Sequence, residues 1–153
     1  MSLRAFQPRS YLVVDASVSL KWALDDEEAV PQAVALRDAA FRDGVQMVAP
    51  SLWLYEITNG LVTAVRRGRL ASELGAEALD HLLALEVRLA DPAARDIYEQ
   101  ALRYGVTSYD AAYLALASVL DVPLWTGDRR LYEAVRQTAG FVRWIGDYHQ
   151  QPG

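Results

Sequence analysis

Short apolar runs alternate with longer segments of helical periodicity along the chain. Strand-forming residues dominate the short runs, which lie at 11–15, 45–49, 122–125 and 141–145, with a weaker candidate at 86–89. Apolar residues recur at helical spacing between them, and the predicted helices span 17–24, 29–42, 52–67, 71–85, 92–104, 108–120 and 129–138. The pattern therefore predicts a regular succession of strands and helices.

Capping preferences mark several of these helix ends. Ser17, Asp91 and Thr107 are the predicted N-caps of the helices that follow them, because a short polar side chain there accepts a hydrogen bond from a free backbone N–H. Pro92 suits the first turn of a helix, and a glycine after a helix favours its termination. The glycines that end predicted helices are Gly44, Gly68 and Gly105.

The alternation of strands and helices predicts the fold class. Parallel strands need crossover connections, which helices supply, so we expect a three-layer α/β/α fold with a small central parallel sheet. A length of 153 residues fits one domain, predicted at 11–146 between an N-terminal arm at 1–10 and a polar tail at 147–153. No apolar run reaches the roughly 20 residues of a membrane span, and the first residues lack a signal-peptide core. We expect a cytoplasmic protein.

Composition restricts the chemistry to oxygen-bearing side chains. The chain has no cysteine, which excludes disulfides, thiolate metal sites and cysteine nucleophiles, and it has only two histidines. Its 15 basic and 20 acidic residues give a net charge of −5, which argues against a broad basic surface for nucleic acid. A carboxylate cluster that binds divalent cations would still attract a phosphate, because the bound cations are positive.

Four acidic residues stand at boundaries or in apolar surroundings. Asp15 and Asp128 each follow a predicted strand, and sites in α/β folds lie beyond the carboxyl ends of strands. Each has an ordinary structural explanation, as a turn or as a helix N-cap. Asp110 lies three residues after Thr107, which is the spacing of a capping box, whereas Glu56 lies in an apolar helix and has no such explanation.

Together these four carboxylates indicate a shared site. We expect Asp15, Glu56, Asp110 and Asp128 to converge at the carboxyl edge of the sheet. Carboxylate oxygens suit the hard ions Mg²⁺ and Mn²⁺. A metal held there would activate water and stabilise a leaving oxygen, which favours phosphodiester hydrolysis.

Four segments, in this order, resemble the successive motifs of the PIN-domain family, in particular its VapC-type toxins. They are VVDAS at 13–17, Glu56 followed by Asn59, SYDAAYLALA at 108–117 and TGDRRL at 126–131. The resemblance covers nearly the whole chain, from about residue 11 to 145. It implies a ribonuclease that uses Mg²⁺ or Mn²⁺ on the four acids, with Ser17, Asn59 and Thr126 as polar support. It also implies a homodimer and inhibition by a VapB-type antitoxin.

Other classes of protein fit the sequence less well. A haloacid-dehalogenase-type phosphatase needs a second acid where Ser17 stands, and a receiver domain needs a lysine at a later strand end, whereas Lys21 lies in the first predicted helix. No P-loop or nucleophile-elbow pattern occurs. The remaining alternative is a PIN-like module that binds metal or a protein partner without cutting RNA. For a nuclease, Arg129 and Arg130 are the candidate RNA-binding residues, because an arginine fork suits phosphate.

Overall fold

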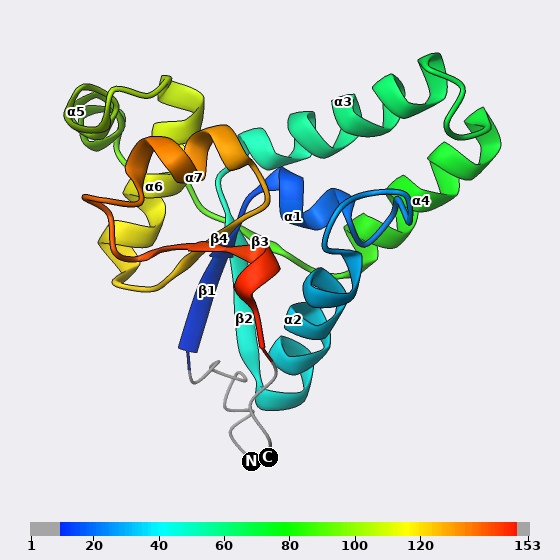
Figure 1. Cartoon of the computed structure of the whole chain (residues 1–153), viewed down its shortest axis with the longest axis horizontal. Coiled ribbons are helices and arrows are strands. Elements are labelled where there is room, and N and C mark those ends of the chain that lie inside the picture. The colour runs from blue at the N-terminus through cyan, green and yellow to red at the C-terminus, as the bar shows by residue number, and fades with distance from the viewer. Residues whose placement is uncertain (1–9, 150–153) are drawn as a thin grey trace, which may run out of the picture.

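The computed structural model of the protein describes residues 10–149, so most of the predicted arm and part of the predicted tail lie outside the described residues. In chain order the elements are β1 (Ser10–Val14), α1 (Ala16–Leu20), α2 (Val30–Asp43), β2 (Val45–Ala49), α3 (Leu52–Arg66), α4 (Ser72–Ala84), β3 (Arg88–Leu89), α5 (Ala94–Tyr104), α6 (Ser108–Leu120), β4 (Leu124–Thr126), α7 (Arg129–Val135), β5 (Val142–Trp144) and a 3₁₀ turn η1 (Ile145–Asp147) (Figure 1). Among these residues no helix is both long and apolar enough to span a membrane.

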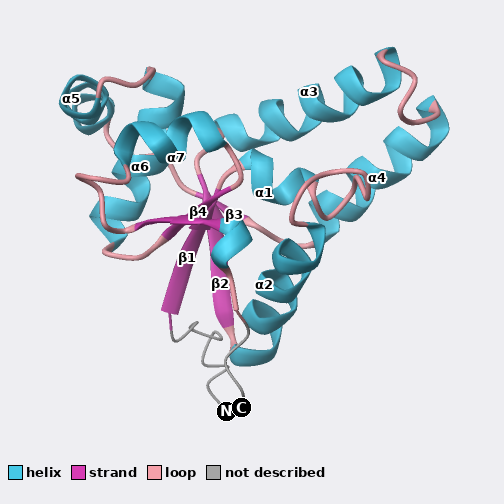
Figure 2. Cartoon of the chain, viewed as in Figure 1, coloured by secondary structure: helices cyan, strands magenta, loops and turns pink. Residues whose placement is uncertain are grey.

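The five strands form one sheet in which every pair is parallel. Their order is β3-β2-β1-β4-β5, so β1 is central, with β2 on one side and β4 on the other. Helices lie on both sides of the sheet (Figure 2). The predicted three-layer fold with a central parallel sheet is therefore confirmed.

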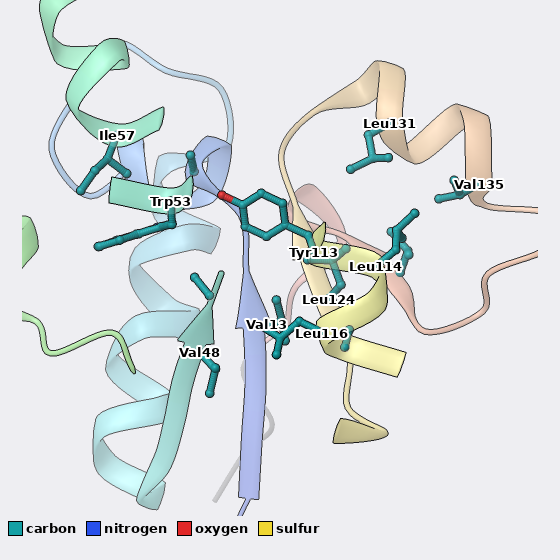
Figure 3. Packing of buried hydrophobic residues seen from close by; sticks show 14 of the residues in the cluster. Val13, Val48, Trp53, Ile57, Tyr113, Leu114, Leu116, Leu124, Leu131 and Val135 are labelled. Atoms are coloured by element: carbon teal, nitrogen blue, oxygen red, sulfur yellow. The ribbon is translucent and has the colours of Figure 1, made fainter. Parts of the chain in front are cut away.

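Successive residues of β1 supply both faces of the sheet. Leu12 and Val14 pack with Met47 against α2 and the side chain of Val18. Val13, which is fully buried, points to the other face and joins a larger cluster built from α3, α6 and α7 (Figure 3). A strand buried on both faces reads as a continuous apolar run, and the sequence at 11–14 has that character.

Helix α6 is the most deeply buried helix of the fold. Its seven consecutive residues from 111 to 117 are all buried, and Leu114 has no exposed surface. A helix that is apolar on all sides must be covered on all sides, and α6 lies between the sheet and α5. Thr107 caps it as predicted, since its hydroxyl oxygen accepts a hydrogen bond from the Asp110 N–H at 3.2 Å.

Helices α3 and α4 form a hairpin that extends away from the sheet (Figure 1). Arg69, in the turn between them, forms ion pairs with Asp26 at 2.6 Å and Glu27 at 3.3 Å in the loop after α1. All three side chains are partly open to solvent, so the pairs contribute little to stability. They nevertheless connect the tip of the hairpin to the segment that follows α1.

Two predicted N-caps were wrong. Ser17 lies inside α1, and Asp15 caps this helix instead by accepting from the Val18 N–H at 3.1 Å. Asp91 does not cap α5, which begins only at Ala94. Its carboxylate accepts from the N–H and the hydroxyl of Ser51, at 2.8 and 2.6 Å, because the chain returns there beside the start of α3.

Some predicted lengths were also too long. The first helix ends at Leu20 instead of 24, and α7 ends at Val135 instead of 138. Both short helices are followed by turns that keep an apolar side chain in the core, Leu24 after α1 and Ala139 after α7. Apolar periodicity that continues into a buried turn cannot be distinguished from helix by pattern alone.

Candidate functional site

The carboxyl ends of β1 and β4 lie side by side in the centre of the sheet. Val14 is paired with Trp125, and the Asp15 N–H donates to the Trp125 carbonyl at 3.3 Å. Beyond this point β1 leads into α1, while β4 leads through Thr126 to Asp128 and α7. The order of the strands reverses on either side of β1, which is where crevices form in open parallel sheets.

Asp15 is held firmly in this crevice. Its side chain is buried, Oδ1 accepts from the Ser17 hydroxyl at 2.5 Å and the Val18 N–H at 3.1 Å, and Oδ2 accepts from the Thr126 hydroxyl. Burial raises the pKa of Asp15 from 3.8 to about 6; the three hydrogen bonds act in the opposite direction, and the negative charge of Asp128 adds to the rise. The carboxylate is therefore oriented by its donors but costly to ionise without a cation beside it.

Two hydroxyls join the ends of the two strands around Asp15. The Ser17 oxygen accepts from the Gly127 N–H at 2.8 Å, and the Thr126 oxygen accepts from the Asp128 N–H at 3.0 Å. Each hydroxyl thus donates to Asp15 and accepts from the backbone after β4. Ser17 and Thr126 lie where polar supports of this carboxylate were predicted.

Asp128 and Asp110 share an arginine. Asp128 caps α7, with Oδ1 accepting from the Leu131 N–H at 3.2 Å. The Arg130 guanidinium lies 3.1 Å from Asp110 Oδ2 and 3.7 Å from Asp128 Oδ2. The ordinary capping explanation of Asp128 is therefore correct, and the same carboxylate also faces the other acids.

Glu56 faces the same space from α3. The Tyr113 hydroxyl donates to Glu56 Oε1 at 2.6 Å. Burial raises the pKa of Glu56, and the negative charges of Asp15, Asp110 and Asp128 raise it further, while the Tyr113 hydrogen bond lowers it. Charges affect one another mainly over short distances in a protein, so Asp15, Asp110 and Asp128 lie in the neighbourhood of Glu56.

Tyr113 belongs to this site, although the sequence interpretation omitted it. It lies in α6, three residues after Asp110 and therefore on the same side of the helix. In Figure 3 its hydroxyl is directed toward α3, the helix that carries Trp53 and Ile57. A tyrosine in the otherwise aliphatic stretch 111–117 needs a partner for its hydroxyl, and that requirement is the signal by which it could have been found.

Asn59 is the one predicted support outside this network. It is exposed on α3, and its side chain forms no hydrogen bond with another residue in the range 10–149. It follows Glu56 by three residues, so the two side chains lie on the same side of the helix.

The predicted arginines lie at the edge of the acidic space. Arg129 stacks on Trp144, with its guanidinium carbon 4.6 Å from the ring centre, and pairs with Glu28 at 3.2 Å. Arg130 pairs with Asp110 and Asp128. Both arginine side chains are exposed, so both can reach a ligand in solvent.

The donor set fits a hard divalent cation. No three acids of residues 10–149 are close enough together to form a ready-made metal cluster. Mg²⁺, however, commonly uses one or two carboxylates and retains several waters, so it does not need such a cluster. Arg130 already places a positive group between Asp110 and Asp128, which is the position of a cation that these two acids attract.

Comparison with known proteins gives one consistent result. The model of the PIN domain family matches residues 12–137. Ribonuclease VapC3 of Pyrobaculum aerophilum is 34% identical over 126 residues, which cover 80% of this chain and 92% of that protein. Ribonuclease VapC1 of Mycobacterium tuberculosis strain H37Rv is 37% identical over 121 residues, covering 71% of this chain and 91% of the relative. The crystal structure of PAE2754 from Pyrobaculum aerophilum superposes with a TM-score of 0.66 at 25% identity, over 89% of this chain and 91% of that one.

Proposed function

Because the chain belongs to the PIN-domain family, we propose that it is a metal-dependent endoribonuclease and the toxin of a VapBC-type toxin–antitoxin pair. The observation that carries the proposal is the arrangement of Asp15, Glu56, Asp110 and Asp128 around one space beyond the ends of β1 and β4. The names of relatives that match most of the chain, ribonucleases of the VapC type, support the same reaction.

The four carboxylates have different roles in this proposal. Asp15 is the fixed ligand, because Ser17, Val18 and Thr126 hold both of its oxygens in place. Asp110 and Asp128, which pair with Arg130, would add negative charge that attracts the cation to this space, where it would keep several of its waters. A bound Mg²⁺ or Mn²⁺ supplies activation of a water and stabilisation of the leaving oxygen.

Glu56 is suited to move a proton. Tyr113 occupies only Oε1, which leaves Oε2 free to accept a proton from the attacking water. Its raised pKa brings the carboxylate closer to the working range of a general base. In the reaction the water oxygen bonds to phosphorus as the bond from phosphorus to the leaving oxygen breaks, and the leaving oxygen takes up a proton, so that one RNA end carries a phosphate and the other a hydroxyl.

The proposed partners are RNA, a VapB-type antitoxin and a second copy of the chain. Large apolar side chains lie open to solvent on α5 and α6: Tyr98 and Leu102 on α5, Tyr109 and Val119 on α6. Exposed apolar surface of this kind marks protein contacts, which supports a homodimer through these helices.

The direct test is cleavage of a labelled RNA by the purified protein. We expect cleavage with Mg²⁺ or Mn²⁺ and none after addition of a chelator, because the four acids need a cation to act on phosphate. Activity that survives the chelator contradicts the metal-dependent reaction. A protein whose melting temperature rises with Mn²⁺ but that leaves every RNA intact instead supports a PIN-like binding module without nuclease activity.

A second prediction concerns the two arginines of α7. Replacing both Arg129 and Arg130 by alanine should weaken RNA binding about tenfold and reduce the dependence of binding on salt concentration, because each phosphate contact contributes to that dependence. Fluorescence anisotropy with labelled RNA in chelator measures both effects. The matched control is Arg95→Ala, because Arg95 is exposed on α5 and pairs only with Glu99 among the described residues. Equal binding of the double variant and the control removes both arginines from the RNA interface.

A further inference from the structure

Lys21 is a lysine with a buried stem that the proposed reaction does not yet use. It is the only lysine of the chain, and just 7% of its surface is exposed. Among residues 10–149 its ammonium forms neither a salt bridge nor a hydrogen bond. The ammonium nitrogen is not one of the enclosed side-chain atoms that lack a partner, so the buried part of Lys21 is its apolar stem, which carries the charged end toward water.

The stem of Lys21 runs toward the acidic site. A methyl group added at Gly127 would lie 2.7 Å from Lys21 Cε and 3.3 Å from the Ser17 hydroxyl oxygen, so the three residues enclose one small space. Gly127 lies between Thr126 and Asp128 and donates its N–H to Ser17, which in turn bonds Asp15. The ammonium, one bond beyond Cε, therefore lies beside the carboxyl ends of β1 and β4.

Helix capping does not explain this orientation. Lys21 is the C-cap of α1, where a cation can favour the last carbonyls. Its side chain runs instead along the Ser17 side of the helix, one turn toward the N-terminus, as side chains four residues apart do. The stem therefore leads away from the last carbonyls of α1 and toward the space between Ser17 and Gly127.

We infer that Lys21 binds a phosphate of the RNA next to the cleaved bond, an inference that rests on the proposed function. The four acids bind a metal cation in the proposed reaction, whereas Lys21 supplies a permanent positive charge beside Ser17 and Gly127. The absence of a side chain at Gly127 leaves room for the lysine stem. An ammonium without a partner among residues 10–149 can pair with an incoming phosphate oxygen, as a compact point charge.

The uniqueness of Lys21 permits a direct experiment. Protein labelled with ¹³C at the ε-carbon of lysine gives a single side-chain signal from the folded chain. Titration with a short single-stranded RNA in the presence of chelator should shift this signal. The chelator removes the divalent cations that the proposed cleavage needs, so the RNA stays intact during the titration. A signal that stays in place while anisotropy shows RNA bound overturns the inference.

Binding and kinetics of Lys21→Met provide the second measurement, because methionine keeps the apolar stem and removes the charge. We expect the dissociation constant for RNA to rise at least about tenfold and the salt slope to fall by about 0.7, the amount for one contact with a single strand. The metal-free melting temperature should change little, since methionine keeps the buried apolar stem. Lys21→Gln serves as a second neutral variant in case methionine packs poorly.

The outcomes separate the two proposals. Wild-type protein that cuts RNA, together with Lys21 variants that bind RNA with unchanged affinity and unchanged salt slope, overturns the role of Lys21 and leaves the nuclease intact. A wild-type protein that neither binds nor cuts RNA overturns the proposed function and the role of Lys21 with it.

Discussion

Asp15→Asn is expected to lower the rate of metal-dependent RNA cleavage by at least about 100-fold. Removing a residue that only supports a metal ligand costs about 10- to 100-fold, and loss of a proposed ligand should cost no less. Asparagine keeps the shape of the side chain and one hydrogen-bonding oxygen, but it removes the negative charge that a cation needs. Because Asp15 is buried and held by Ser17, Val18 and Thr126, no other acid can move into its place. Single-turnover cleavage of a labelled RNA with Mn²⁺ measures the effect.

The same substitution should not weaken the metal-free fold. The pKa of Asp15 is about 6 in the folded protein and near 3.8 when the chain is unfolded. Between these two values the folded protein binds more protons, so the free energy of unfolding decreases as pH rises from about 4 to 6, and the cost of ionisation is fully present above pH 6. At pH 7 in chelator, Asp15→Asn should be as stable as the wild type or more stable, by on the order of 1 kcal/mol.

Thermal melts with chelator and with excess Mn²⁺ test both statements. The wild-type melting temperature should rise with Mn²⁺ more than that of Asp15→Asn, because stabilisation by a ligand follows its affinity for the folded state. Asp38→Asn is a matched control, since Asp38 is an exposed acid of α2 that pairs with Arg37. Equal metal-induced shifts in the wild type and Asp15→Asn would remove Asp15 from the metal site.

Tyr113→Phe should lower cleavage about 10- to 100-fold, which is the usual loss when a residue that orients a ligand is removed. The phenol donates to Glu56 Oε1 at 2.6 Å and lowers the pKa of that carboxyl. Without it the pKa of Glu56 rises further, so the acidic limb of the pH–rate profile should move to higher pH. The fold should lose only about 1 kcal/mol, the net contribution of a typical hydrogen bond.

The pH profile distinguishes positioning of Glu56 from simple packing. Tyr109→Phe is the control, because Tyr109 lies on the same helix but is exposed. If Tyr113→Phe loses activity with an unchanged pH profile, its hydroxyl does not act through Glu56. Activity at the wild-type level would make the hydrogen bond a structural contact only.

The local pattern of the sequence predicted most of the fold. The strand at Val45–Ala49 and the helix at Ser108–Leu120 have the bounds expected from apolar runs and a threonine cap. The errors arose where a partner is distant in the chain. Asp91 looks like a cap in its own segment, but its acceptor oxygens are used by Ser51, forty residues earlier.

The candidate site was predictable to a different degree. The residues of its four motifs stand out by residue type, and the parallel fold places two of them, Asp15 and Asp128, at neighbouring strand ends. The contacts made by the side chains could not be read from the sequence. Tyr113 and Glu56 are 57 positions apart, and the approach of Lys21 to Gly127 depends on how α1 packs against β4. Such contacts depend on tertiary packing rather than on any local pattern.

The pairing of β1 with β4 also determines when the site can exist. Asp15 and Thr126, which share a hydrogen bond, are 111 positions apart, and β4 docks beside β1 only after the segments between them have been made. Contacts of such long range form late, because the entropy of closing the loop must be overcome first. A chain that ends before residue 122 contains Asp15, Glu56 and Asp110 but lacks the strand that brings the crevice together. The complete site can therefore form only after nearly the whole chain has been synthesised.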